Sequence, residues 1–152
     1  MGTPEVESQR RVHGPLSFDP LSQEALDIVR KSAERWNAGD FEGMFELYAD
    51  DMVLVTGEHW PEANVQIEGK DAIRESTRDW LSVWESIELE TGHVEVYGEK
   101  VVAHGHWRLT GRGSGVPGTM PIHMVLTVRD GKIARLEYYP DHERAVAASR
   151  GG

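Results

Sequence analysis

The sequence predicts a single α+β domain in which helices precede an antiparallel sheet. Apolar residues recur at helical spacing in the first half of the chain, and alternating apolar and polar residues fill most of the second half. At 152 residues, the chain is long enough for one hydrophobic core and too short for two independently packed halves. Helices followed by a meander of strands predict a curved sheet with the helices on one face.

Composition narrows the classes of function. With 39% hydrophobic and 28% charged residues the chain has the composition of a soluble globular protein. Its 26 acidic and 16 basic residues give a formal net charge of −10, which disfavours nucleic-acid binding. It contains no cysteine, and no apolar run approaches the roughly 20 residues of a membrane span. We therefore expect no nucleic-acid partner, no membrane partner and a cytoplasmic location.

The first 20 residues differ from the rest of the chain. Residues 1–20 contain three prolines and two glycines and show no apolar period, which predicts a flexible N-terminal arm. We expect the folded domain to span residues 21–149.

The first structural elements are predicted from spacing and capping residues. From Ser22, a plausible N-cap, apolar residues recur every three to four positions until Gly39, which predicts the first helix. Asp40 then caps a short second helix, and residues 52–56 form an apolar strand. Residues 71–84 predict a third helix.

The remaining elements are strands. The predicted strands are residues 87–97, 101–112, 119–129 and 132–139. Gly98-Glu99 and Asp130-Gly131 predict tight hairpins, and the glycine-rich residues 111–118 predict a longer connection.

Several short segments, taken in order, carry a family resemblance. They are residues 36–40 (Trp-Asn-Ala-Gly-Asp), residues 48–51 (Tyr-Ala-Asp-Asp), the Asp130-Gly131 hairpin and the helical tail at residues 142–148. Together they resemble the nuclear transport factor 2-like superfamily, and within it the SnoaL-like proteins, relatives of ketosteroid isomerases and polyketide cyclases. The resemblance covers roughly residues 25–148. It implies a cone-shaped curved antiparallel sheet, with the N-terminal helices packed on its concave face around one pocket.

Aromatic residues are candidates for the pocket wall. Alternation along the strands places Trp107, Met124 and Tyr138 on the inward face. The aromatic candidates as a set are Trp60, Trp80, Trp84, Trp107 and Tyr138. They either surround a flat apolar ligand or fill the core, and sequence alone leaves both interpretations open.

The resemblance also locates the positions where ketosteroid isomerases carry their catalytic groups. Counting from the shared segments places Ser32, Thr56 and Met124 at those positions. Thr56 is no base near neutral pH, and Met124 cannot donate a hydrogen bond as a buried carboxylic acid can. We therefore predict no ketosteroid isomerase activity, and keep these three residues as ligand-binding candidates. The strands after residue 101 also lack the inward aspartates and arginine of limonene epoxide hydrolases.

Two residues remain as candidates for catalysis. Glu58 follows Thr56 by two positions, so it faces inward if the strand continues, and burial would raise its pKa toward the range of a general base. Alternatively, Gly57 ends the strand and Glu58 lies in a solvated loop. Tyr48 is a hydroxyl able to orient a carbonyl group.

Histidines gather on the outward face of the sheet. His104, His106 and His123 share this face, and pairing of the two strands is expected to bring His106 beside His123. No carboxylate joins them nearby in sequence, so we expect no metal site and no cofactor. The family resemblance implies a homodimer through this outer sheet face, and our hypothesis is that the dimer weakens as the histidines become charged at low pH.

Three functions remain open. The first is an enzyme with a cofactor-independent cyclase, isomerase or dehydratase (lyase) activity on an apolar carbonyl compound. The second is a noncatalytic protein that binds an apolar aromatic or polyketide-like ligand in the same pocket. In the third, the sheet is an assembly surface and the pocket is incidental.

Overall fold

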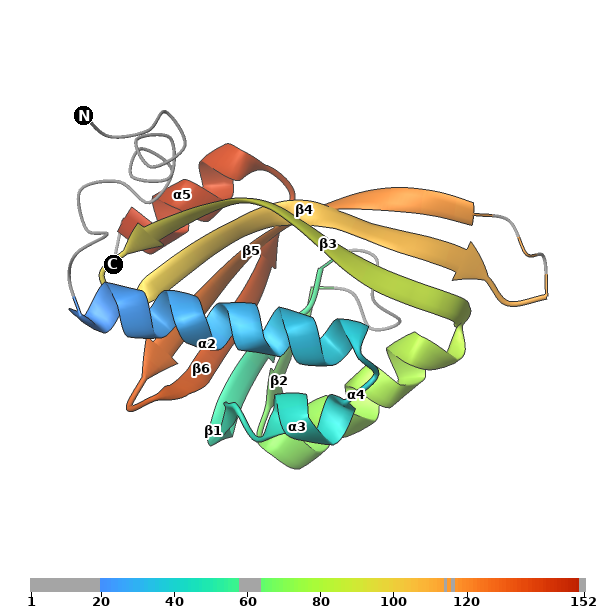
Figure 1. Ribbon diagram of the computed structural model, residues 1–152, viewed down its shortest axis with the longest axis horizontal. Helices are drawn as coiled ribbons and strands as arrows, with labels where there is room; N and C mark the ends of the chain where they lie inside the picture. The colour runs from blue at the N-terminus through green and yellow to red at the C-terminus, as the bar shows by residue number, and fades with distance from the viewer. Residues whose placement is uncertain (1–19, 58–63, 114, 116, 151–152) are drawn as a thin grey trace, which may run out of the picture.

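The computed structural model describes residues 20–57, 64–113, 115 and 117–150. The helices are α2 (Pro20–Asn37), α3 (Phe41–Phe45), α4 (Lys70–Ser82) and α5 (His142–Arg150). The strands are β1 (Tyr48–Val55), β2 (Gln66–Glu68), β3 (Trp84–Tyr97), β4 (Lys100–Gly111), β5 (Pro117–Arg129) and β6 (Lys132–Tyr139). This arrangement confirms the predicted α+β class, with α2 running along the inside of a curved sheet (Figure 1). The predicted arm lies almost wholly outside the described residues.

The sheet has six strands in the order β2-β1-β6-β5-β4-β3. The predicted meander is confirmed, because β3, β4, β5 and β6 pair antiparallel in succession. The sheet is nevertheless mixed, because β1 lies parallel to β6. This pairing arises because the last strand of the meander returns beside the first strand of the chain. The strand β2, which was not predicted, pairs antiparallel with β1 at one edge.

The helix boundaries follow from local hydrogen bonds. Asp40 caps α3 as predicted, since its Oδ1 accepts a hydrogen bond of 3.0 Å from the Gly43 N–H. Gly39 has a φ of +77°, which explains why a glycine follows the end of α2. The prediction that Ser22 caps α2 is wrong. Ser22 lies inside the helix, is buried, and donates to the carbonyl oxygen of Gly98 at 3.4 Å.

The end of α4 also differs from the prediction. The helix stops at Ser82, and Trp84 is the first residue of β3. The apolar spacing predicts a longer helix because Trp80, Leu81 and Trp84 recur at helical intervals. Trp84 instead packs on Trp80 across the turn, with ring centroids 5.7 Å apart.

The two faces of the sheet are covered differently. On the concave face, side chains of α2 pack with those of the strands to form the main core, which includes Ala25, Val29, Ala103 and Leu126. On the outer face a second, smaller cluster joins Val102 and Val125 to Ala145 of α5. The helix α5 therefore covers part of the outer face through which a homodimer was expected (Figure 1).

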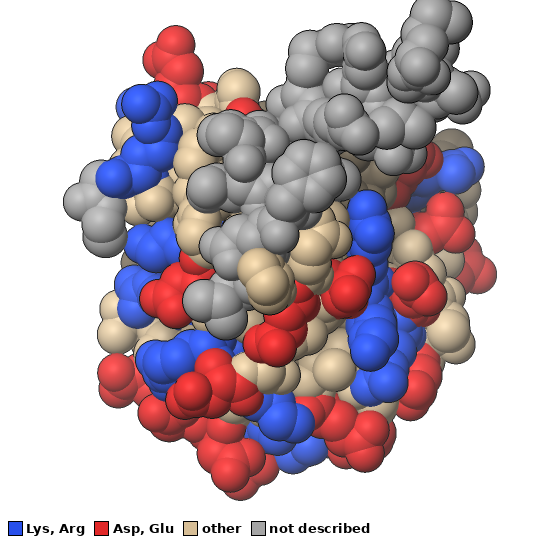
Figure 2. Space-filling model, turned by 60° about the vertical axis from the view of Figure 1, so that its left-hand side comes forward, with Lys and Arg blue, Asp and Glu red and all other residues tan. Residues whose placement is uncertain are grey.

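Acidic and basic side chains are intermixed on the face shown in Figure 2. Some of these charges pair, as Arg74 does with Glu42 at 3.1 Å and with Asp71 at 3.0 Å. Among the described helices, none is both long and apolar enough to cross a membrane.

A candidate ligand cavity on the concave face

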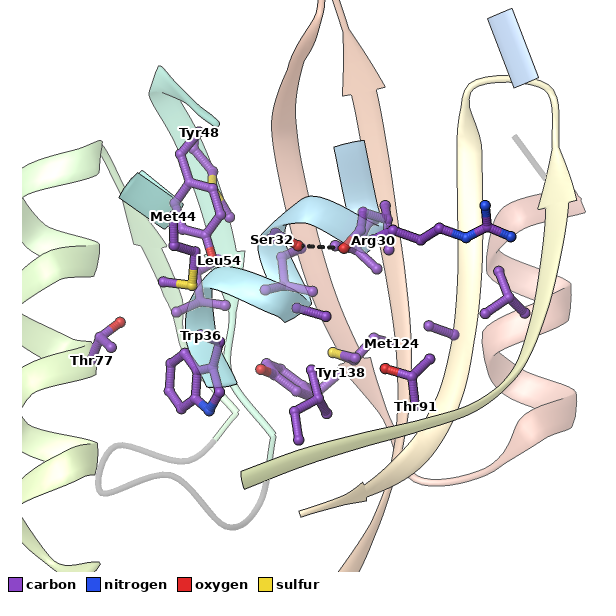
Figure 3. Close-up of a pocket in the computed structure, with 18 of the residues that line it drawn as sticks. Arg30, Ser32, Trp36, Met44, Tyr48, Leu54, Thr77, Thr91, Met124 and Tyr138 are labelled. Atoms are coloured by element: carbon purple, nitrogen blue, oxygen red, sulfur yellow. Dashed lines mark hydrogen bonds between the residues drawn. The ribbon is translucent and has the colours of Figure 1, made fainter. Parts of the chain in front are cut away.

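A cavity of about 80 Å³ lies between α2 and the concave face of the sheet (Figure 3). Aliphatic, methionine and aromatic side chains from α2, β1, β4, β5 and β6 make up most of its wall. Its polar lining residues are Arg30, Ser32, Tyr48, Thr77, Thr91 and Tyr138. Arg30 is exposed and its guanidinium extends away from the other lining residues, so the interior is lined by uncharged groups.

The three positions equivalent to the isomerase groups have different roles. Ser32 lines the cavity, but its hydroxyl donates to the carbonyl oxygen of Val29 at 2.7 Å, within its own helix. Met124 lines the cavity with an apolar side chain. Thr56 is buried outside it and holds the backbone of Val65, whose N–H donates to Thr56 Oγ1 at 3.0 Å. The role of Thr56 is therefore structural.

Trp36 is a cavity residue that sequence reasoning missed. Its side chain is 8% exposed and packs on Trp107 of β4, with ring centroids 5.2 Å apart. Its Nε1 atom is buried and has no hydrogen-bond partner among the described residues. A signal was present, because Trp36 lies one helical turn after Ser32, and residues four apart share a helix face. Trp36 thus lines the cavity and carries a buried donor that has no partner among the described residues.

Two tyrosines supply further hydroxyl groups. Tyr48 lies on β1 and Tyr138 on β6, and both side chains line the cavity (Figure 3). Burial raises the pKa of Tyr48 above its ordinary value. Burial is also the main cause that raises the pKa of Tyr138, and the charge that Tyr48 would carry when ionised is a smaller cause. Both phenols are therefore neutral near pH 7 and act as hydrogen-bond donors rather than as bases.

The chemistry of this cavity is limited by what lines it. Among the described lining residues there is no carboxylate and no imidazole. General-base catalysis needs such a group within hydrogen-bond reach of the substrate. The described part of this cavity can accordingly bind and orient a molecule through hydrogen bonds, but it offers no side chain that would remove a proton near neutral pH.

A second, larger cavity of about 370 Å³ adjoins the first. Trp107 and Tyr138 line both cavities, so these two aromatic side chains form part of each wall. The second cavity is also lined by Trp80 and by Gly57 and Asn64, the described residues on either side of residues 58–63. Its volume falls within the range of about 300–1,000 Å³ that is usual for ligand sites, whereas that of the first does not.

The predicted aromatic set is thus only partly brought together. Trp107 and Tyr138 line both cavities and Trp80 lines the second, whereas Trp84 lines neither. Glu58 and Trp60, predicted as base and ligand contact, lie outside the described residues. The role of Glu58 therefore stays a prediction.

The arrangement of the outer-face histidines differs from the expectation. In the β4–β5 register His104 lies opposite His123, whereas His106 lies opposite Pro121. A carboxylate that sequence reasoning did not consider also reaches this face, because Glu95 of the neighbouring strand β3 lies 3.3 Å from His104 Nε2. Glu95, His104 and His142 bring potential metal-ligand atoms within 4.8 Å of one another.

An α+β domain with helices on the concave face of a mixed sheet and an apolar cavity between them is the architecture of the nuclear transport factor 2-like fold. Residues 29–136 match the sequence model of the SnoaL-like domain. The chain therefore belongs to the SnoaL-like domain family, as the sequence resemblance implied.

Solved structures share this fold. TerC co-crystallised with polyporic acid superposes with a TM-score of 0.69 at 20% identity, over 85% of this chain and 99% of that one. Rv0760c from Mycobacterium tuberculosis, in complex with estradiol-17beta-hemisuccinate, has a TM-score of 0.67 at 17% identity, over 79% and 95% of the two chains.

A third structure has higher identity to this chain. A candidate SnoaL-like polyketide cyclase from Mesorhizobium loti is 26% identical, with a TM-score of 0.58 over 75% of this chain and 97% of that one. No curated protein sequence gives a significant match to the chain.

Proposed function

We propose that this protein binds a small, flat, apolar molecule that carries at least one carbonyl oxygen. The observation that supports this most directly is the Trp36 Nε1 atom, a buried donor in an apolar cavity that has no acceptor among the described residues. A buried donor left unpaired costs about 1–3 kcal/mol, so a ligand oxygen that accepts from it gains affinity. The neutral hydroxyls of Tyr48 and Tyr138 line the same cavity and add donors to it.

The size of the ligand follows from the two cavities. A volume of about 80 Å³ admits only the edge of a ring system, so the larger cavity of about 370 Å³ would hold its body. The rings of Trp107 and Tyr138, which border both spaces, would then contact the ligand at its middle. Co-crystallisation of TerC with polyporic acid and the complex of Rv0760c with a steroid ester show that proteins of this fold bind small molecules, which supports the proposal.

A matched pair of probe compounds tests the role of the carbonyl. Anthraquinone and anthracene share a flat tricyclic shape, and only the first has carbonyl oxygens. Quenching of tryptophan fluorescence would measure the affinity of the full chain for each. We expect tighter binding of anthraquinone, and a loss of about tenfold on Trp36→Phe, since one hydrogen bond contributes about 0.5–1.5 kcal/mol.

A matched control variant is available in the same chain. Trp84 Nε1 is also buried and without a partner among the described residues, but Trp84 lines neither cavity. Trp84→Phe should leave both affinities unchanged. Equal affinity for the two probes, or equal loss in the Trp36 and Trp84 variants, would contradict the proposal.

The enzyme function remains a second candidate, as a cofactor-independent cyclase, isomerase or dehydratase. The observation that favours it is the position of Gly57 and Asn64 at the second cavity, because the predicted base Glu58 follows Gly57 directly in sequence. Mass spectrometry of compounds that co-purify with the native protein would identify a substrate class. With that compound as substrate, Glu58→Gln should abolish turnover and retain binding. Unchanged turnover in this variant would exclude Glu58 as the base. Absence of turnover in the native protein would favour the binding function.

A further inference from the structure

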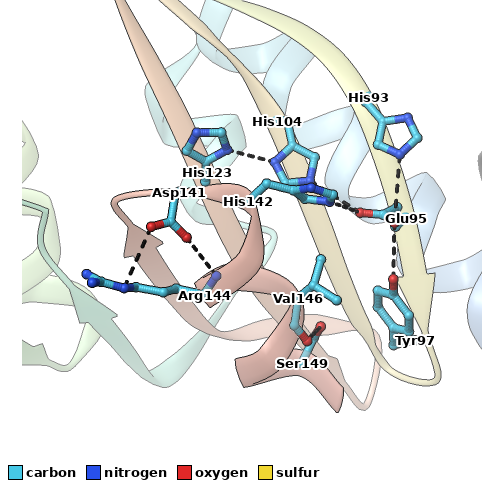
Figure 4. Close-up of polar contacts among 10 residues, drawn as sticks. All are labelled: His93, Glu95, Tyr97, His104, His123, Asp141, His142, Arg144, Val146 and Ser149. Carbon is cyan, nitrogen blue, oxygen red and sulfur yellow. Dashed lines mark hydrogen bonds and ion pairs between the residues drawn. The ribbon is translucent and has the colours of Figure 1, made fainter. Parts of the chain in front are cut away.

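A cluster of histidines surrounds one carboxylate on the outer face of the sheet, away from the cavity of the concave face. Glu95 and His93 lie on β3, His104 on β4 and His142 at the start of α5 (Figure 4). Two neighbouring strands and the C-terminal helix α5 therefore converge on one carboxylate. A β-bulge between Thr91 and Val94 shifts the register of β3, and His93 falls within it.

The distances in this cluster are short. His142 Nε2 lies 2.9 Å and His104 Nε2 lies 3.3 Å from the same atom, Glu95 Oε1. Ligand atoms at the corners of a tetrahedron with metal distances of about 2.0–2.1 Å are separated by about 3.3 Å. The two imidazole nitrogens thus lie from Glu95 Oε1 at close to this separation, and all three ligand atoms lie within 4.8 Å of one another.

The cluster also has a supporting shell. The Tyr97 hydroxyl donates to Glu95 Oε2 at 3.1 Å, whereas His104 and His142 approach the other carboxylate oxygen, Oε1. His104 Nδ1 and His123 Nδ1 are 2.9 Å apart, and in the tautomer in which His104 donates, its Nε2 lone pair is directed at Glu95. Histidines that bind metals usually donate their second ring N–H in this way.

Access to the cluster is one-sided. The side chains of His104 and Glu95 are 13% and 21% exposed, whereas that of His142 is 54% exposed. The strands therefore fix two of the groups, and the solvent side is open to a fourth ligand such as water. His93 stacks on His104 with ring centroids 5.8 Å apart, and its Nε2 lies 3.8 Å from Glu95 Oε2 (Figure 4).

We propose that Glu95, His104 and His142 form a binding site for a divalent transition-metal ion, with zinc as the best match. Two imidazoles and one carboxylate suit zinc and its neighbours, whereas magnesium and calcium prefer all-oxygen sites. The ion would join α5 to β3 and β4. It would thereby stabilise the packing of α5 on the outer face of the sheet.

A metal-free alternative makes a different prediction. Without a metal ion, the Glu95 carboxylate can instead accept hydrogen bonds, if both imidazoles donate N–H groups to its Oε1 atom. Those hydrogen bonds, together with that from Tyr97, account for the pKa of the Glu95 carboxyl, which lies below its ordinary value although burial acts to raise it. In that case the cluster is a hydrogen-bond network with no stoichiometric affinity for an ion.

A calorimetric titration distinguishes the metal site from the hydrogen-bond network. The untagged full chain is first dialysed against a chelator and then titrated with zinc chloride. We expect one zinc ion per chain and a rise in the thermal unfolding midpoint, because an ion that binds only the folded state stabilises it. Cobalt(II) in place of zinc should give the intense visible absorption of a tetrahedral site. His142→Ala and Glu95→Gln should each weaken zinc binding at least tenfold.

The exposed outer-face residue His106 provides the control, because it takes no part in the cluster. His106→Ala should leave the zinc affinity and the cobalt spectrum unchanged. Because His142 is largely exposed, its replacement should leave the chain folded, which circular dichroism would verify. Absence of stoichiometric binding to the native chain, or equal affinities in the His142 and His106 variants, would overturn the proposal.

Discussion

Asn37, the last residue of α2, exchanges two hydrogen bonds with the backbone of Leu89 in β3. Its Nδ2 donates to the Leu89 carbonyl oxygen at 2.8 Å, and its Oδ1 accepts from the Leu89 N–H at 2.8 Å. The side chain thereby pairs with an edge strand much as a neighbouring strand would. It attaches the end of α2, next to Trp36, to the sheet that forms the opposite wall of the cavity.

Asn37→Ala should lower the free energy of unfolding by about 1–2 kcal/mol, because it removes two largely solvent-accessible hydrogen bonds. Asn37→Asp should also destabilise the protein, since aspartate accepts but cannot donate to the Leu89 carbonyl oxygen. Urea denaturation followed by circular dichroism would measure both effects. Wild-type stability in Asn37→Ala would show that the bridge contributes nothing.

Gly105 in β4 should not tolerate a side chain. A Cβ atom at this position would clash with the backbone carbonyl oxygen of Glu90 in the neighbouring strand. Gly105→Ala should therefore destabilise the fold by about 1–3 kcal/mol through displaced backbone. Gly118→Ala in β5 is the matched control, because a Cβ there meets no atom within 4 Å and should change stability by about 0.5 kcal/mol or less. Thermal unfolding of the two variants would compare them, and equal midpoints would contradict the predicted clash.

Stability should fall at alkaline pH as the tyrosines ionise. Burial raises the pKa of Tyr48 and Tyr138, and burial together with the Glu137 hydrogen bond raises that of Tyr139 to about 12. Between about pH 10, the ordinary tyrosine value, and these raised values, the folded state holds protons that the unfolded state has lost. The stabilisation is therefore complete below about pH 10 and declines above it.

Tyrosinate absorbance followed during an alkaline titration would check this. The absorbance of the buried tyrosines should rise together with loss of the circular dichroism signal, and Tyr48→Phe should shift unfolding toward higher pH. Tyrosinate formation by Tyr48 in a chain that remains folded would contradict the assignment of a buried, neutral phenol.

We also predict a homodimer, through the part of the outer sheet face that α5 leaves uncovered. This part includes the exposed His106, and Arg108, which pairs with Glu88 at 3.4 Å and with Glu90 at 3.5 Å. Across a two-fold axis each substitution occurs twice, so His106→Asp should introduce a pair of like charges and weaken association. Light scattering should give twice the chain mass for the native protein and a lower mass for the variant. A native protein of single-chain mass would show the expected dimer to be wrong.

Local patterns in the sequence were sufficient for most elements of the fold. The limits of β6 were predicted to the residue, because the Asp130-Gly131 turn and strand alternation are both local signals. The end of α4 and the start of α2 were missed. Trp84 continues a helical spacing, and only its packing on Trp80 shows that the chain has turned. Ser22 has the side-chain chemistry of an N-cap, but it is buried inside the helix and donates to the carbonyl oxygen of Gly98.

The cavity was predicted less completely than the fold. Five of the residues predicted to line a pocket do line the first cavity, between α2 and the sheet: Ser32, Tyr48, Trp107, Met124 and Tyr138. Trp36 was missed because an apolar residue in a helix stripe does not reveal whether its polar atom finds a partner. That depends on which side chains of other elements come within hydrogen-bond distance.

By itself, the sequence determined the α+β class, the order of the helices and strands, the faces of the central strands and the family. Each of these depends on periodicity, capping or turn chemistry within short stretches of chain. Only the tertiary structure decided that β1 lies parallel to β6, that His104 rather than His106 meets His123, and that Glu95 and His142 join them. These contacts link residues distant in sequence. They depend on strand register and on the docking of α5, which no local pattern specifies.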